Sequence, residues 1–238
     1  MQPQDPQQPA RAGAHAGTSP GVLLDCVTLG PWQVNCYIVR EAIAKPSDPC
    51  WIIDASFEPA ELIGRVRTLG LQPKALILTH AHVDHIAGVD EVLRAFPGTP
   101  VLIHSAEADW LSDPMKNLGL MMGMRITAQG PHDTMDDGQQ LRLGETAWRV
   151  FHTPGHSPGG ITLYCEQARI AVVGDTLFAG SIGRTDFPRS DFATLAQSIR
   201  ERLYTLAPET VVHPGHGPST TIARERLSNP FVRDDARR

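Results

Sequence analysis

The sequence predicts an α+β fold in which helices cover the outer faces of β-sheets. Short segments rich in β-branched and apolar residues precede segments of helical periodicity in both halves of the chain. Between them, pairs of short apolar segments typical of antiparallel hairpins occupy the middle of the sequence. Elements ordered in this way pack as layers that share apolar cores.

Each predicted element follows from a local pattern. In chain order, the segments that predict strands are 22–29, 34–39, 51–53, 75–79, 101–104, 141–143, 148–151, 161–164, 170–173 and 211–212. The segments that predict helices are 58–69, 84–96, 105–111, 190–206 and 220–227. We expect Ser190 to cap the fourth of these helices. Four of the 6 methionines lie between Met115 and Met124, where we expect core packing in preference to a mobile flap.

The length and net charge of the chain indicate its domain organisation and disfavour some classes of partner. The chain has 238 residues, of which 41% are apolar, so it is long enough to bury a core. We expect a single domain over residues 21–232, a disordered Gln- and Pro-rich tail at 1–20 and a frayed end at 233–238. The net charge of −5 does not favour nucleic acid or an anionic membrane as a partner. No apolar run approaches the roughly 18 residues of a spanning helix.

The cysteines do not form a metal-binding or disulfide pattern. Cys26, Cys36, Cys50 and Cys165 show no CxxC pair and no framework spacing. This spacing predicts reduced, mostly buried thiols and a cytoplasmic location.

The strongest chemical signal is a cluster of ligand-type side chains where a strand meets a helix. His80 and His82 share one face of an extended segment, and Asp84 and His85 follow at the start of the predicted helix. One metal ion cannot readily accept all four side chains from so tight a turn, whereas two adjacent ions can. We favour this interpretation over a polar loop with unrelated histidines.

Three further segments place ligand-type residues directly after predicted strands. They are His152-Thr153-Pro154-Gly155-His156, Gly174-Asp175-Thr176 and His213-Pro214-Gly215-His216-Gly217. Each alone is most often turn chemistry. Their recurrence at strand ends predicts convergence at one rim of a layered sheet.

In these segments the chain resembles the metallo-β-lactamase superfamily, whose motif is HxHxDH followed by a distant His, a bridging Asp and a final His. The resemblance covers about residues 22–231 and implies a four-layer αββα sandwich. It implies that His80, His82 and His156 hold one metal ion, that Asp84, His85 and His216 hold a second, and that Asp175 bridges them. His152 and His213 would then be structural hydrogen-bonding partners.

The resemblance also implies two divalent cations, for which zinc is the first choice and iron or manganese the alternatives, because the donors are imidazoles and carboxylates. Segments 174–178 and 183–187 look like the glyoxalase II and persulfide dioxygenase branch, and the segment around His216 looks like short bacterial glyoxalase II-like hydrolases. Because 22 residues follow His216, we expect the C-terminal glutathione-binding domain of longer glyoxalase II enzymes to be absent. Arg184 is the candidate for binding a substrate carboxylate, and the alternative is a surface or loop-fixing arginine paired with Asp186. Gly183 is the candidate for making room for the substrate.

The function so implied is hydrolysis of a small-molecule glutathione thioester such as S-lactoylglutathione. A hydroxide between the metals would attack the carbonyl carbon, with Asp84 and Asp175 as the catalytic carboxylates that orient it. The alternatives are a persulfide dioxygenase with one iron on His80, His156 and Asp175, a lactonase, and a non-catalytic protein that kept the fold. The sequence does not determine the oligomeric state.

Overall fold

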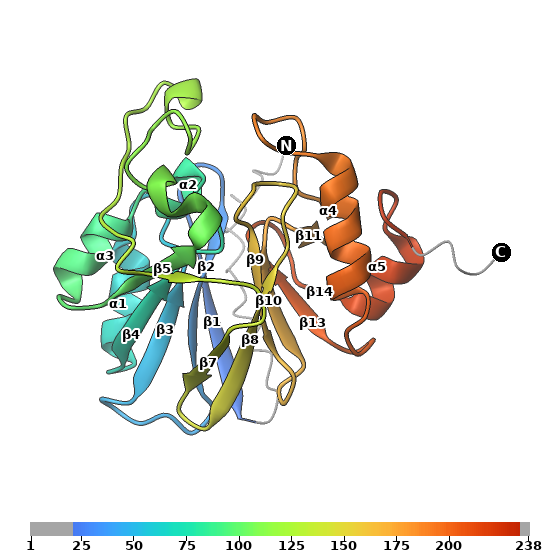
Figure 1. Cartoon of the computed structure of the whole chain (residues 1–238). Coiled ribbons are helices and arrows are strands. Elements are labelled where there is room, and N and C mark those ends of the chain that lie inside the picture. Colours follow the sequence, from blue (N-terminus) through green and yellow to red (C-terminus); the bar gives the residue numbers. More distant parts are fainter. Residues whose placement is uncertain (1–20, 234–238) are drawn as a thin grey trace, which may run out of the picture.

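The computed structural model describes residues 21–233, so the predictions for residues 1–20 and 234–238 lie outside the described residues. Two β-sheets pack face to face, and helices cover the outer face of each (Figure 1). This arrangement confirms the predicted α+β fold and its four αββα layers.

The first sheet has 6 strands in the spatial order β1-β2-β3-β4-β5-β6. The first three strands pair antiparallel, and the pairs from β3 to β6 are parallel. The strands are β1 (Val22–Leu29), β2 (Val34–Glu41), β3 (Pro49–Ile53), β4 (Gln72–Ile77), β5 (Val101–His104) and β6 (Asp133–Met135).

The second sheet has 6 strands in the order β14-β13-β10-β9-β8-β7, and only β10 and β13 pair in parallel. The strands are β7 (Gln140–Leu143), β8 (Thr146–His152), β9 (Ile161–Cys165), β10 (Ile170–Gly174), β13 (Val211–Pro214) and β14 (Thr220–Thr221). A separate hairpin joins β11 (Leu177–Phe178) to β12 (Ser181–Ile182).

Helices α1 and α3 flank the first sheet, and α4 and α5 flank the second (Figure 1). The helices are α1 (Ala60–Thr68), α2 (Val83–Ile86), α3 (Val89–Ala95), the 3₁₀ helices η1 (Ser105–Trp110) and η2 (Leu120–Met122), α4 (Phe192–Ser198), its π-helical continuation η3 (Ile199–Leu203) and α5 (Ile222–Ser228). Within residues 21–233, none of these helices has the length and apolar content needed to cross a bilayer.

Three apolar clusters separate the four layers. Ile38 of β2 packs with Leu62 of α1 in the outer cluster of the first sheet, and its neighbour Val39 faces the cluster between the sheets. Val173 of β10 and Leu195 of α4 lie in the third cluster. Successive residues serve different clusters because side chains alternate along a strand. The two rims of the sandwich are thereby left to the connecting loops.

The helix predicted over 84–96 is wrong as a single element, because it divides at Gly88 into α2 and α3. The N–H of Gly88 donates to the main-chain oxygen of Ala55 at 2.8 Å instead of continuing the helix. A Cβ at this position would overlap the main-chain oxygen of Ser56, so only glycine allows this close approach. The result is a one-turn α2 that ends beside the rim.

Other helix boundaries also move. Asp191, not Ser190, caps α4, since its Oδ2 accepts a hydrogen bond of 2.7 Å from the N–H of Thr194. The helix predicted over 220–227 begins two residues later, because β14 first pairs with β13. Strands β6, β11 and β12, of 2 or 3 residues each, were not predicted; they are too short for a periodic signal.

The prediction that the methionines of 115–124 pack in the core is wrong. Met115, Met121 and Met122 are 62%, 53% and 40% exposed. The loop is anchored instead by a polar residue, the buried Asn117, whose amide donates to the main-chain oxygens of Trp110 and Ile126. These methionines are therefore on the surface, close to the rim of the sandwich.

Candidate metal centre

The structure brings all seven predicted ligand residues to one rim of the sandwich. They lie in or just after the loops that follow β4, β8, β10 and β13, and two of them, Asp84 and His85, belong to α2. Helix α2 lies at the upper edge of the sheets in Figure 1. The potential ligand atoms form three groups, each with its atoms within 4.8 Å of one another: His80, His82 and His156; His80, His85 and Asp175; and Asp84, His85 and His216. The first group and the third match the two sets implied by the sequence resemblance.

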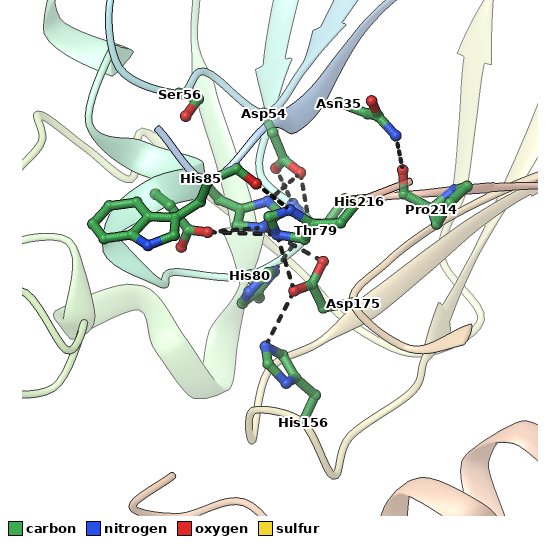
Figure 2. A network of polar contacts seen from close by, with 12 residues as sticks. Asn35, Asp54, Ser56, Thr79, His80, His85, His156, Asp175, Pro214 and His216 are labelled. Carbon is green, nitrogen blue, oxygen red and sulfur yellow. Dashed lines mark hydrogen bonds and ion pairs between the residues drawn. The ribbon is translucent and has the colours of Figure 1, made fainter. Parts of the chain in front are cut away.

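Asp175 lies between His156 of the first set and His85 and His216 of the second (Figure 2). Its Oδ1 is 3.5 Å from Nε2 of His85, and its Oδ2 is 3.6 Å from Nε2 of His156 and 3.4 Å from Nε2 of His216. Two atoms bound to the same tetrahedral zinc ion lie roughly 3.4 Å apart. These separations, longer than good hydrogen bonds, suit ligands that share a cation.

Hydrogen bonds fix the orientation of four of the imidazoles. Each uses Nδ1, with Thr79 Oγ1 at 3.1 Å from His80, Asp54 Oδ2 at 2.8 Å from His85, Arg184 O at 2.8 Å from His156 and Trp32 O at 2.9 Å from His216. The rings of His85, His156 and His216 therefore direct Nε2 toward Asp175. A second partner that holds the other ring nitrogen is a regular feature of metal-binding histidines.

Several buried atoms in the cluster have no hydrogen-bond partner. They are Nε2 of His80, His85 and His156, and Oδ1 of Asp175. Unpartnered polar atoms in the interior are costly unless a ligand satisfies them. The residues present thus fit a bound metal ion by orientation, spacing and unfilled coordination capacity.

The first group is held in the neutral form. Burial, followed by the neighbouring imidazoles, lowers the pKa values of His80 and His82 well below the ordinary value, and burial also lowers the pKa of His156. A neutral imidazole offers a lone pair, which is the form that binds a metal ion.

The second group is rich in negative charge. Burial lowers the pKa of His85, but the carboxylates of Asp54, Asp84 and Asp175 outweigh it and raise the pKa to about 9. The pKa of His216 rises to about 11, because its contacts with Asp175 and Asp84 outweigh burial. The same imidazoles hold the pKa of Asp175 well below its usual range against the opposing effect of burial. The negative charge that raises the pKa values of these histidines also favours the binding of a cation.

His152 and His213 lie outside the three groups. Nε2 of His152 contacts the main-chain oxygen of Pro158 at 2.8 Å, and its ring stacks on that of His104 at a centroid distance of 4.0 Å. Nδ1 of His213 is 3.1 Å from Oγ of Ser219. The structural role expected for both is consistent with these contacts.

Sequence reasoning missed three residues that hold the site. Asp54 bonds to His85 and to Thr79, Asn35 bonds to main-chain oxygens of Pro214 and Gly217 beside His216, and Glu107 bonds to main-chain N–H groups in two loops. Asp54 directly follows the strand predicted at 51–53, so the strand-end pattern could have found it. No local signal marks Asn35 or Glu107.

A cavity of about 270 Å³ opens beside the cluster. Besides ligand candidates and Arg184, its wall is apolar and comprises Trp32, Val83, Leu118, Met122, Phe178 and Phe187. Arg184 forms two hydrogen bonds with Asp186, at 2.9 and 2.8 Å, and its guanidinium lies 4.3 Å from the ring centroid of Phe187. The predicted carboxylate-binding residue thus lies at the cavity with an acidic partner already in place.

The expectation for Gly183 is not supported by the packing around it. A Cβ there would overlap the main-chain oxygen of Asp175 and lie 3.0 Å from the ring of His156. The missing side chain makes room for the site's own residues, not for a substrate.

Comparisons with known proteins agree with this geometry. Residues 29–216 match the profile of the Metallo-beta-lactamase superfamily. The chain is 38% identical over 205 residues to the probable metallo-hydrolase YqgX of Bacillus subtilis, covering 86% of this chain and 94% of that protein. It is 33% identical over 211 residues to the hydroxyacylglutathione hydrolase GloC of Haemophilus influenzae, covering 88% and 97% of the two chains.

Two solved structures are similar at comparable identity. One is described as the BLEG-1 B3 metallo-beta-lactamase, with a TM-score of 0.82, 37% identity and coverage of 88% of this chain and 99% of that one. The other is TTHA1623 in a di-iron-bound form, with a TM-score of 0.76, 38% identity and coverage of 87% and 98%.

Proposed function

Because the chain belongs to the metallo-β-lactamase superfamily, we propose that this metallo-hydrolase cleaves thioesters of the hydroxyacylglutathione class. The observation that carries the proposal is the convergence of five imidazoles and two carboxylates beside an open cavity. A group of six such residues around Asp175 has the capacity for two cations, whereas a one-iron dioxygenase would use only His80, His156 and Asp175.

The chemistry of the proposed centre is that of a Lewis acid. When bound, divalent cations lower the pKa of coordinated water to about 7 and polarise a carbonyl oxygen. His80, His82 and His156 would hold one cation, and Asp84, His85 and His216 the other, with Asp175 shared. We take zinc as the first choice and iron or manganese as alternatives, since imidazole and carboxylate donors suit all three and a similar structure is described as di-iron-bound.

Asp84 and Asp175 have the catalytic roles in this proposal. Both carboxylates face the cavity, and the pKa of each is lowered because adjacent imidazoles outweigh burial. Ionised carboxylates accept hydrogen bonds from the attacking water and orient it toward the carbonyl carbon. A thiolate is a good leaving group, so no separate acid is needed.

The cavity wall supplies the substrate contacts. The aromatic rings of Trp32, Phe178 and Phe187 exclude water from the scissile bond and pack against the substrate. Nε and Nη2 of Arg184 bond to Asp186, which leaves the N–H groups of Nη1 free of that carboxylate. We propose that these donors bind a carboxylate of the substrate at the rim.

The choice of a glutathione thioester is supported by the relative named hydroxyacylglutathione hydrolase. We further propose that the partners are small molecules and not nucleic acid or membrane, in keeping with a net charge of −5. A cytoplasmic location is supported by the four cysteines, all of which are free thiols.

The test measures metal content and substrate range together. Protein isolated without added metal is analysed for metal per chain and then assayed with S-lactoylglutathione, glutathione persulfide, a lactone and a β-lactam. The proposal expects about two divalent ions, thioester cleavage abolished by a chelator and restored by zinc, and thioester as the preferred substrate. One iron per chain with oxygen uptake on persulfide would overturn it, as would thioester cleavage that survives complete removal of metal.

A further inference from the structure

Glu107, on the 3₁₀ helix η1, is a carboxylate with no solvent exposure. Burying a carboxylate costs free energy unless both oxygens are hydrogen-bonded. Oε2 accepts a hydrogen bond of 2.6 Å from the N–H of Ala81, and Oε1 accepts one of 2.6 Å from the N–H of Gly159. Each oxygen is therefore used by a main-chain donor, and the two donors belong to different loops.

These two loops bear the first ligand group. Ala81 stands between His80 and His82, after β4 of the first sheet, and Gly159 follows His156 in the loop between β8 and β9 of the second sheet. One side chain thus spans the two sheets at the level of the group His80, His82 and His156. Glu107 itself does not line the cavity, so it is placed to act through the loops.

The contact with the second loop is close-packed as well as polar. A Cβ on Gly159 would lie 2.7 Å from Cγ and 2.9 Å from Cδ of Glu107. The loop therefore rests directly on the Glu107 side chain, and glycine permits that approach. The contact therefore couples the Glu107 side chain to the main chain of the loop that bears His156, at a position three residues after that histidine.

We propose that Glu107 is a positioning residue that sets the separation of the two loops and thereby the affinity of the first ligand group for its cation. The inference rests on the proposed metal centre but not on the identity of the substrate. In the metal-free protein, the same contacts hold the loops together before any ion arrives, so less ordering remains to be done on binding.

The chain offers a matched control in Glu225. This glutamate is also fully buried, and it accepts hydrogen bonds from the N–H of Gly180 at 2.9 Å and from Oγ1 of Thr220 at 2.6 Å. It joins α5 to the turn between β11 and β12 and belongs to none of the three ligand groups. Glu107→Gln and Glu225→Gln therefore make the same change in equally buried carboxylates with different attachments.

The first measurement is zinc affinity by competition with a chromophoric chelator. His156→Ala and His216→Ala, which each remove a ligand from one set, identify the signal of each cation. In Glu107→Gln, we expect the first cation to bind at least about 10-fold more weakly and the second to bind within twofold of the starting protein. Glu225→Gln should leave both affinities within twofold. Equal weakening of both cations in Glu107→Gln, or no weakening, would overturn the proposal.

The second measurement is hydrogen exchange in the metal-free protein. Glu107→Gln should accelerate exchange in residues 80–82 and 153–160 together, whereas Glu225→Gln should accelerate it only around the residues that Glu225 contacts, Gly180, Thr220 and Asn229. Unchanged exchange in both loops contradicts the proposal. If Glu107→Gln does not fold, Glu107→Asp, which keeps the charge but is one methylene too short to reach both donors, must show the same selective loss. If the protein does not cleave thioesters but the binding and exchange results are as expected, the proposed substrate is wrong and the role of Glu107 stands.

Discussion

Oδ2 of Asp54 lies 2.8 Å from Nδ1 of His85, and both side chains are almost fully buried. The same carboxylate accepts hydrogen bonds from the N–H and the hydroxyl of Thr79, at 2.8 and 2.7 Å. Asp54 thus fixes both the ring of His85 and the residue that precedes His80. Its φ of 58° lies in the left-handed region, which Asp and Asn tolerate better than most residues.

Asp54→Asn should weaken metal binding without unfolding the protein. Asparagine tolerates the backbone angle but has one oxygen in place of two, so it cannot accept all three hydrogen bonds that the carboxylate forms with the N–H and hydroxyl of Thr79 and with His85. We expect metal affinity to fall by about 10- to 100-fold, measured by chelator competition. Asp109→Asn, an exposed site, serves as control and should retain the original affinity. Equal affinities in the two variants would argue against a role for Asp54.

Asp175→Asn should reduce metal occupancy and reaction rate together. The amide replaces an oxygen that faces His156 and His216 and brings no negative charge to offset a cation. Metal per chain and kcat for S-lactoylglutathione are measured on the same preparations, with losses of about 100-fold in rate expected at stoichiometric metal. Full activity in this variant would exclude Asp175 from the site.

Substitutions of Arg184 and Asp186 should change KM in opposite directions. If the guanidinium binds substrate, Arg184→Ala should raise KM about 10-fold with kcat little changed, because one charge-assisted hydrogen bond is lost. Asp186→Asn should lower KM, because it frees Nε and Nη2. A pair that only stabilises the loop predicts the same change in both variants, and steady-state kinetics distinguish the two cases.

Gly215→Ala should disrupt the site by packing alone. The new Cβ would overlap Oδ1 of Asp175 and lie 2.8 Å from Cε1 of His85. We expect a loss of stability of about 1–3 kcal/mol and a loss of metal binding. Gly64→Ala in α1 is the control, since no atom lies within 4 Å of its Cβ; it should bind metal normally and gain about 0.5–1 kcal/mol in helix stability. Thermal unfolding and metal content of the two variants provide the check.

His213 predicts a dependence of stability on pH. Burial lowers its pKa from an ordinary value of 6.5 to about 4. The unfolded chain therefore binds a proton before the folded protein does, so stability is complete above about pH 6.5 and falls as the pH decreases toward 4. The expected loss over this window is up to about 3 kcal/mol. Urea unfolding of the original chain and of His213→Gln should give curves whose difference varies across this window. A difference that is constant with pH would contradict the prediction.

The sequence predicts those features of the fold that depend on residues close together in the chain, and it does not predict those that depend on distant residues. Periodicity places Ile38 and Val39 on opposite faces of a strand without further information, and the strands of the central layers were predicted with small boundary errors. The break at Gly88 depends on the main chain of Ser56, which lies elsewhere in the sequence and is brought there by packing. The prediction that the methionines of 115–124 pack in the core was wrong for the same reason. This loop is anchored by the buried amide of Asn117 and not by an apolar face.

The sequence by itself determined the chemical identity of the candidate centre, because His80, His82, Asp84 and His85 are adjacent and each remaining donor follows a strand end. Only the tertiary structure decided which atoms face one another and what holds them there. Asp54, Glu107 and Asn35 act through hydrogen bonds to residues 25 to 182 positions away, and no local pattern encodes contacts of that separation. The same holds for the position of Arg184 at the cavity, whereas its pairing with Asp186, two residues along the chain, is a local contact.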